Sequence, residues 1–369
     1  MTTKRTPENE RVKRRYLQFL KEVKGRDEAS LDAVAKALER FDEHSRRRDF
    51  RKFHVEQAIA FKKHLSEQRN VRTGEALSAS TINATLAALK AFIVWLADQP
   101  DYRARIRYLD AEYFNPPDNL VRIATAHRFR PCATLAQIRL VLDAMPAETE
   151  IERRDRALVA FTILTGARDR AIVSFKLKHI NLERGLIEQD GREVATKRAK
   201  TFTTWFFPVG AEIEKIVVDW VLFLRNEKGF SPDAPIFPKT RVEPGTDLQF
   251  RAAGLDRVHW ANADPVRAIF REAFARAGLP YFNPHSFRHT LMQLAYERKL
   301  DAEQVKAWSQ NLGHESVLTT FCSYGTISPH RQGELIRGGS HGNEPTDPDL
   351  TPDMLRRIAN ELEKKRKAS

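Results

Sequence analysis

The second half of the sequence carries basic, imidazole and phenol side chains whose types together suit one chemistry, the exchange of phosphodiester bonds. In chain order they are Arg168 in Thr-Gly-Ala-Arg, Lys200 in Lys-Thr, His285 and Arg288 in His-Ser-Phe-Arg-His, His314 in Leu-Gly-His, and Tyr324. Such an exchange passes through a transition state that gathers negative charge on the non-bridging oxygens. Guanidinium groups stay protonated and donate in a planar fork, so the two arginines suit that charge.

The lysine, histidines and tyrosine complete the chemistry. The phenol of Tyr324 can store the bond as a phosphotyrosine ester, so that rejoining needs no external energy. Lys200 near a phosphate can protonate the leaving 5′ oxygen, and a histidine can take the phenol proton or bond the phosphate. The set requires no metal, and we expect no cofactor.

Each group also has an ordinary structural interpretation. Lys200 could be a hairpin lysine like its neighbour Lys197, and Tyr324 a partly buried aromatic. His285 and His289 are spaced four apart and could bind zinc on one helical face, although serine follows His285 and no third ligand is obvious. Taken jointly and in this order, the residues favour the phosphodiester chemistry over these separate interpretations.

Local sequence patterns predict the elements that position this set. Thr165-Gly166 is a natural end for an apolar helix over 155–165, and a second helix opens near Arg168. Residues 180–209 contain short β-forming stretches bounded by polar residues and glycine, which predicts a small antiparallel sheet with a basic turn. Helical patterns resume at about 211 and run to about 324, interrupted near 231–256.

The N-terminal part, from 10 to about 110, has the pattern of a small helical bundle. Its clearest helix places apolar residues at steps of three and four, and these are Ile82, Leu86, Leu89, Ile93 and Leu96. Ser30 is a plausible N-cap for an earlier helix. Basic runs at 46–48, 51–52 and 62–63 indicate either a surface that tracks phosphates or simply a solvated face.

Breaks in these patterns predict the domain limits. We expect a helical domain over 1–112, a basic linker over 113–131 that contains Pro116-Pro117, a second domain over 132–338, and a connector with a C-terminal helix over 339–369. That last helix, near 352–363, could dock on another subunit or be a frayed basic tail.

Composition limits the possible partners. The formal net charge of +13 indicates a polyanion such as double-stranded DNA, although a basic soluble protein without a nucleic-acid role would share it. Cys132 and Cys322 form neither a disulfide framework nor a zinc-ligand spacing, which suits a reducing cytoplasm. We expect no signal peptide, no stretch long enough to span a bilayer and no membrane partner.

The order of the six residues resembles that of the tyrosine recombinases, the family of phage lambda integrase and Cre. The resemblance is specific over about 131–335, whereas the N-terminal bundle resembles the family's core-binding domain mainly by pattern. It implies a mainly α fold with a small antiparallel β-sheet, in which a helical core-binding domain precedes a catalytic domain.

The resemblance also assigns roles. Arg168 matches the first catalytic arginine, Lys200 the hairpin lysine with Lys197 as the alternative, His285 and Arg288 the His-x-x-Arg motif, His314 the second histidine, and Tyr324 the nucleophile. The family often has an acidic residue three after its first arginine, where this chain has Ala171. Tyr324 lies ten residues after His314, where nine is commoner.

The implied activity is site-specific recombination. The family clamps duplex DNA between its two domains, forms a 3′-phosphotyrosine, and exchanges strands with four protomers on two sites. Two alternatives use the same fold or a similar residue set: a type IB topoisomerase that relaxes DNA, and a DNA-binding protein without catalytic activity.

Overall fold

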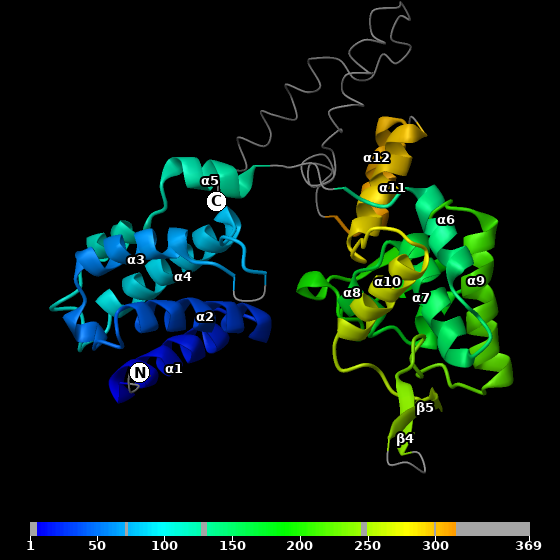
Figure 1. Cartoon of the computed structure of the whole chain (residues 1–369), viewed down its shortest axis with the longest axis horizontal. Helices are drawn as coiled ribbons and strands as arrows, with labels where there is room; N and C mark the ends of the chain where they lie inside the picture. The colour runs from blue at the N-terminus through cyan, green and yellow to red at the C-terminus, as the bar shows by residue number, and fades with distance from the viewer. Residues whose placement is uncertain (1–5, 71–72, 127–130, 245–248, 299, 315–369) are drawn as a thin grey trace, which may run out of the picture. The chain divides into compact units, whose positions relative to one another are not determined.

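The computed structural model describes residues 6–70, 73–126, 131–244, 249–298 and 300–314. The chain forms two compact units, 1–126 and 127–369, and each is described by itself (Figure 1). Both are mainly helical, and the second also contains small antiparallel sheets, which confirms the predicted fold class.

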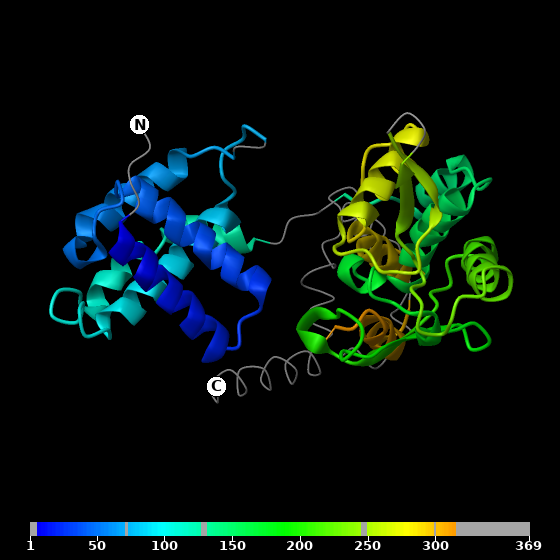
Figure 2. The same cartoon turned by 90° about the horizontal axis from the view of Figure 1, so that it is seen from below.

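The first unit is a helical bundle. Its elements are α1 (Pro7–Glu22), α2 (Glu28–His44), η1 (Phe50–Lys52), α3 (Val55–Glu67), α4 (Ala79–Ala97), η2 (Tyr108–Phe114) and α5 (Asp118–Thr125). Figures 1 and 2 show α1 and α2 lying side by side. The five apolar residues predicted to share one face of α4 are all buried. Tilted and edge-on aromatic rings around Phe41 and Phe92 also contribute to the core.

Helix α4 is long and apolar enough to cross a membrane by length and composition, which we did not expect from the sequence. It contacts α2, α3, α5 and η2, and its buried apolar residues belong to the core of the first unit. A core helix of this kind passes the same test as a membrane span, so the finding is weak support for a membrane.

Two local predictions in this unit need correction. The N-cap of α2 is Asp27 and not Ser30, because the Asp27 carboxylate accepts from the Ser30 backbone N–H at 2.7 Å and starts the helix earlier. The segment expected as a linker from 113 contains α5, which packs on α4. Pro117 directly precedes the first residue of α5, where a missing N–H is tolerated, so the prolines introduce a helix.

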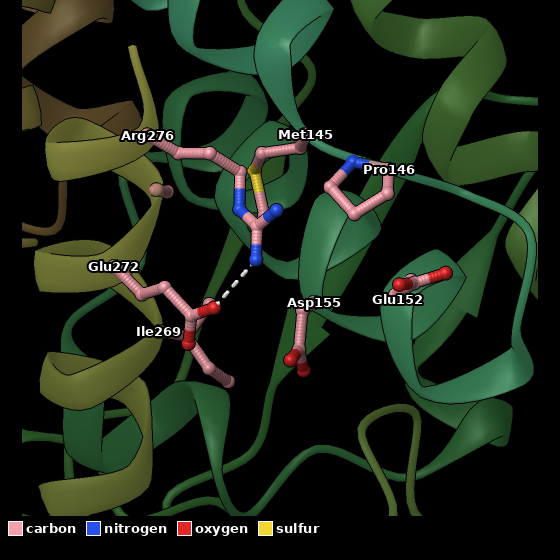
Figure 3. A pocket seen from close by; sticks show the side chains of 8 residues that line it. Met145, Pro146, Glu152, Asp155, Ile269, Glu272 and Arg276 are labelled. Atoms are coloured by element: carbon pink, nitrogen blue, oxygen red, sulfur yellow. Dashed lines mark hydrogen bonds and ion pairs between the residues drawn. The ribbon is translucent and has the colours of Figure 1, made fainter. Parts of the chain in front are cut away.

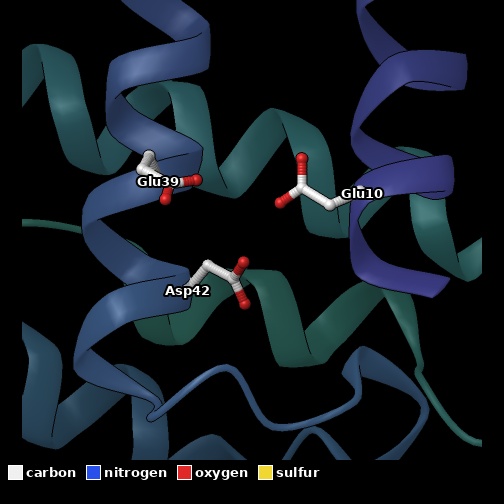
Figure 4. Close-up of side chains that lie close together, drawn as sticks. All are labelled: Glu10, Glu39 and Asp42. Carbon is white, nitrogen blue, oxygen red and sulfur yellow. The ribbon is translucent and has the colours of Figure 1, made fainter. Parts of the chain in front are cut away.

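A buried charge network joins α1 and α2. Figure 4 shows the carboxylates of Glu10, Glu39 and Asp42 converging, with oxygens within 4.8 Å of one another. The Lys13 ammonium binds all three, at 2.6, 2.7 and 2.9 Å. Burial lowers the pKa of Lys13, but these hydrogen bonds outweigh it and raise the pKa above its usual value. Lys13 and Arg47, which pairs with Glu39 at 2.9 Å, thus offset two of the three negative charges from within the protein.

The second unit is built around one buried helix. Its helices are α6 (Leu135–Ala144), α7 (Glu150–Thr165), α8 (Asp169–Ile172), α9 (Ala211–Leu222), α10 (Asp264–Arg276), α11 (Ser286–Glu297) and α12 (Ala302–Asn311), with short turns η3 (Leu177–His179), η4 (Lys197–Ala199) and η5 (Phe223–Glu227). Every residue of α7 from Ala157 to Thr165 is buried, and α7 packs on α6, α9, α10 and α11. It starts before the predicted 155 because Thr149 and Glu152 form a capping box.

The predicted antiparallel sheet is confirmed. It consists of β1 (Ile180–Asn181), β2 (Leu186–Gln189) and β3 (Phe202–Trp205) in the order β1-β2-β3, with Leu186 opposite Trp205 and Gln189 opposite Phe202. The basic turn between β2 and β3 contains η4.

A second hairpin, of β4 (Thr240–Pro244) and β5 (Phe250–Leu255), occupies the region where we expected only an interruption of helices. Its base is anchored by the buried guanidinium of Arg154, whose Nη1 donates to the Pro238 carbonyl at 3.0 Å and to Thr240 Oγ1 at 2.8 Å. An anchor so distant in sequence leaves no local signal, which is why the hairpin was missed.

Candidate active site

Helix α7 ends at Gly166, as predicted, and places Arg168 at the start of α8. Gly166 has φ +60, and its N–H donates to the Thr162 carbonyl at 2.9 Å, which closes the helix in a left-handed turn. An added Cβ at Gly166 would lie 2.6 Å from a methyl carbon of Leu312. Only glycine therefore allows both the left-handed backbone and the close approach of Leu312. As a result, the end of α7 packs tightly against the end of α12.

Helix α12 ends in a Schellman motif that accounts for Leu-Gly-His. Gly313 has φ +69, its N–H donates to the Gln310 carbonyl at 2.7 Å, and the His314 N–H reaches back to the Ser309 carbonyl at 3.1 Å. An added Cβ at Gly313 would lie 2.5 Å from the ring of Phe202 at the start of β3. The motif thus fixes His314 directly after the helix and against the lysine-bearing hairpin.

Arg288, from α11, joins these two helix ends. Arg288 is only 2% exposed, and its guanidinium donates to the Gly166 carbonyl and to the Leu312 carbonyl, each at 2.6 Å. A third contact, at 2.8 Å, runs from Nη2 to Nε2 of His314. Because carbonyls at helix C-termini carry partial negative charge, they suit a buried cation.

His314 is held as a neutral ring. A guanidinium only donates, so Nε2 of His314 accepts and the ring proton lies on Nδ1, facing Ser309 Oγ at 3.5 Å. Burial, and then the positive charges of Arg288 and Arg168, lower the pKa of His314 to about 3. In this arrangement His314 supports Arg288.

His285 precedes α11 and is in part exposed to solvent. Partial desolvation by the surrounding protein, followed by repulsion from Arg288, His289 and Arg168, lowers its pKa to about 4. The ring is therefore neutral near pH 7 and able to accept a proton. The rings of His285 and His289 lie edge to face with centroids 5.9 Å apart, and in the described residues no third ligand groups with them as a metal site.

Lys200 follows a tight turn. Arg198 and Ala199 have φ +61 and +51, both left-handed, and an added Cβ at Gly191 would lie 2.0 Å from the Ala199 carbonyl oxygen. Thr196 Oγ1 donates to the Lys200 carbonyl at 2.8 Å. These contacts fold the basic turn back on itself.

The turn and the two helix ends enclose one cationic cavity of about 230 Å³. It is lined by Arg168, Lys197, Arg198, Lys200, Phe202, Gly313 and His314. Both candidate lysines face it, so the geometry does not choose between Lys197 and Lys200. Arg198 and Phe202 were not singled out from the sequence, although Arg198 stands in the same basic run.

Of the six expected residues, Arg168, Lys200 and His314 line this cavity, and Arg288 contacts His314. His285 lies near enough to Arg168 and Arg288 for their charges to lower its pKa. Tyr324 lies outside the described residues, as does the expected helix near 352–363. The Asp169 carboxylate, next to Arg168, accepts hydrogen bonds from Nε and Nη2 of Arg267 at 3.0 and 2.7 Å. Ala171, at the position where the family often has an acidic residue, is buried in the core.

Two further cavities lie elsewhere. Figure 3 shows one between α6, α7 and α10, where Arg276 pairs with Glu272 at 2.8 Å beside Asp155. Burial raises the pKa of Asp155. This cavity shares no residue with the cationic one.

The third cavity, of about 420 Å³, lies in the first unit and is lined in part by Arg46 and Arg48. Arg47, between them in sequence, is mostly buried and does not line this cavity. Its side chain is 11% exposed and pairs with Glu39 at 2.9 Å. The basic run at 46–48 is therefore partly structural and partly free to meet solvent or a ligand.

Comparison with known proteins agrees with these findings. Residues 133–330 match the model of the phage integrase family. The chain is 24% identical over 246 residues to the tyrosine recombinase XerC of Vibrio cholerae serotype O1, covering 67% of each chain. It is 24% identical over 245 residues to XerC of Escherichia coli O157:H7, covering 66% of this chain and 69% of the relative.

Solved structures share the fold. A lambda integrase dimer bound to a COC′ core site matches with a TM-score of 0.56 at 14% identity, covering 91% of this chain and 98% of that chain. The Tn1549 transposon integrase in complex with transposon right end DNA matches with the same TM-score and identity, covering 89% and 99%.

Proposed function

The chain belongs to the phage integrase family and is a DNA strand-exchange enzyme, and from that premise we propose that it recombines specific DNA sites through a 3′-phosphotyrosine formed on Tyr324. The observation that carries the proposal is the buried Arg288, held by two helix ends beside a cavity lined by Arg168, His314 and two lysines. That cavity concentrates fixed positive charge where a phosphate must gain negative charge.

The proposed reaction has two balanced steps. The Tyr324 oxygen forms a bond to the scissile phosphorus while the bond to the 5′ oxygen breaks, and the phenol proton passes to neutral His285. Lys200 gives its proton to the leaving 5′ oxygen, so that no unstable alkoxide is released. Attack by the 5′ hydroxyl of a partner strand then reverses these transfers and frees Tyr324.

Arg168 and Arg288 stabilise the charge on the non-bridging oxygens throughout. Loss of one such donor typically slows a reaction by about 100-fold to 1,000-fold. His314 contributes by accepting from Arg288 and so orienting the guanidinium. This reaction needs no nucleotide and no metal ion.

Double-stranded DNA is the proposed partner, and the net charge of +13 supports it. The related lambda integrase is known as a dimer on a core site and as a tetramer on a Holliday junction. We propose the same assembly here, four protomers on two sites, because exchange of both strands between two duplexes needs four cleavages. Action in the cytoplasm is part of the proposal, and the free thiol of Cys132 suits that compartment.

Trapping the covalent intermediate tests the proposal. A DNA site nicked next to the scissile phosphate loses a short fragment after cleavage, so a protein–DNA adduct accumulates and is resolved on a denaturing gel. Tyr324→Phe is expected to abolish the adduct while DNA binding is kept, and Tyr296→Phe, the nearest preceding tyrosine, is expected to leave both intact. Full adduct formation by Tyr324→Phe would refute the assignment, as would relaxation of a supercoiled plasmid with no exchange between two sites.

A further inference from the structure

Asn311, the last residue of α12, binds the outer edge of the hairpin sheet. Its Oδ1 accepts from the Trp205 backbone N–H at 2.7 Å, and its Nδ2 donates to the Trp205 carbonyl at 2.8 Å. Since β3 is the outer strand of its sheet, the Asn311 carboxamide satisfies both backbone groups as one peptide unit of a further strand would. Thr204 Oγ1 adds a third bond, to the Asn311 carbonyl at 2.9 Å.

These bonds link two parts of the cationic cavity that lie more than 100 residues apart in sequence. Strand β3 begins two residues after Lys200, and Asn311 precedes His314 by three residues. Phe202 closes a second connection, because its ring lies against Gly313 and under the Lys200 ammonium, whose Nζ is 5.9 Å from the ring centroid. The lysine turn and the helix end are thus held together on both sides of β3.

We propose that Asn311 is a positioning residue that docks β3 on the end of α12 and so places Lys200 in the cavity that Arg168 and His314 also line. The proposal rests on the proposed function, because it assigns Lys200 the protonation of the leaving 5′ oxygen. The first half of the turn is anchored by the buried Val194 and by Glu193, which pairs with Lys176 and Lys178. Residues 197–199, directly before Lys200, are exposed, so Asn311 constrains the lysine from the β3 side of the turn.

The variants differ in what they remove. Asn311→Ala loses both bonds to Trp205. Asn311→Asp keeps the shape and the acceptor, but it loses the donor and sets a carboxylate oxygen against the Trp205 carbonyl. Each is expected to slow cleavage by about 10-fold to 100-fold, the effect of two lost hydrogen bonds or of a displacement near 1 Å. Gln310→Ala, at the neighbouring exposed position, is the matched control.

A sulfur substitution at the leaving position separates positioning of Lys200 from general damage. A 5′-bridging phosphorothiolate at the scissile phosphate releases a thiolate, which needs no proton, whereas the ordinary substrate releases an oxygen that does. With nicked substrates of both kinds, both Asn311 variants and Lys200→Ala are expected to be slow on oxygen and within about 3-fold of wild type on sulfur. Arg288→Ala is expected to be slow on both, and Gln310→Ala fast on both.

The result that overturns the proposal is an equal defect of the Asn311 variants on both substrates, or no defect on either. Equal binding of the uncleaved site by wild type and variants, and a cooperative urea transition for each variant that begins only above the assay conditions, show that the comparison is made on folded protein. Absence of any adduct from the wild-type enzyme on either substrate is a different outcome, because it would refute the proposed function itself.

Discussion

Gly313→Ala tests whether the close approach between α12 and β3 shapes the site. The matched control is Gly278→Ala, because Gly278 also ends a helix, with φ +66 and the same two returning hydrogen bonds, from Gly278 to Ala275 at 3.0 Å and from Leu279 to Phe274 at 2.9 Å. The two sites differ in their surroundings. Nothing lies within 4 Å of an added Cβ at Gly278, whereas at Gly313 the Phe202 ring lies at 2.5, 2.8 and 3.0 Å.

The magnitudes follow from this difference. A left-handed backbone costs an L-residue about 1–2 kcal/mol at either position. Overpacking against Phe202 adds about 1–3 kcal/mol at Gly313 only. Urea unfolding is therefore expected to show a loss of about 2–5 kcal/mol for Gly313→Ala and about 1–2 kcal/mol for Gly278→Ala. Cleavage of a nicked substrate is expected to fall by about 100-fold for Gly313→Ala, because the ring and the lysine turn must move, and to stay near wild type for Gly278→Ala.

Equal losses of stability in the two variants, together with wild-type cleavage by Gly313→Ala, would refute this reasoning. They would show that the Phe202 ring turns aside freely and that its contact with Gly313 does not fix the position of Lys200.

Three further predictions address other parts of the chain. Between pH 6.5 and about 3, His314 binds a proton in the unfolded chain but not in the folded protein, so the free energy of unfolding should decrease as the pH is lowered through this range. His314→Gln should make that decrease shallower in urea titrations at several pH values, and an identical slope would contradict the buried neutral ring. Lys13→Met removes the one ammonium that binds all three carboxylates of the cluster and should lower the free energy of unfolding in urea by about 3–5 kcal/mol. A change below about 1 kcal/mol would show that the network relaxes around Arg47. Arg46→Ala and Arg48→Ala should each reduce the slope of log affinity for DNA against log salt concentration by about 0.9, the effect of one lost phosphate contact. Arg47→Ala should instead lower the free energy of unfolding. A salt slope that changes only for Arg47→Ala would reverse the assignment.

Local chemistry explains what could be predicted from the sequence. The end of α7 at Gly166 was predictable because glycine alone takes a left-handed turn without strain, and the buried face of α4 because its apolar residues recur at helical spacing. The hairpin around the basic turn was predictable from two short β-forming stretches with polar residues between them. In each case the determining residues lie within one element.

The features that were missed depend on contacts between distant segments. Hairpin β4–β5 relies on Arg154, more than 80 residues earlier in the sequence. The pairing of Asn311 with Trp205 joins positions 106 apart. The residue types of the candidate site were visible in the sequence, but the anchoring of Arg288 by two backbone carbonyls was not, because backbone acceptors carry no sequence signal.

That anchoring has a consequence for the enzyme before it meets DNA. Several like charges gathered in one cavity repel one another, and an empty site built only from side chains would tend to open. Two main-chain oxygens at the ends of α7 and α12 hold the Arg288 guanidinium in the absence of any phosphate, so the site is preorganised when the duplex arrives. Little of the energy of phosphate binding is therefore consumed in ordering this guanidinium.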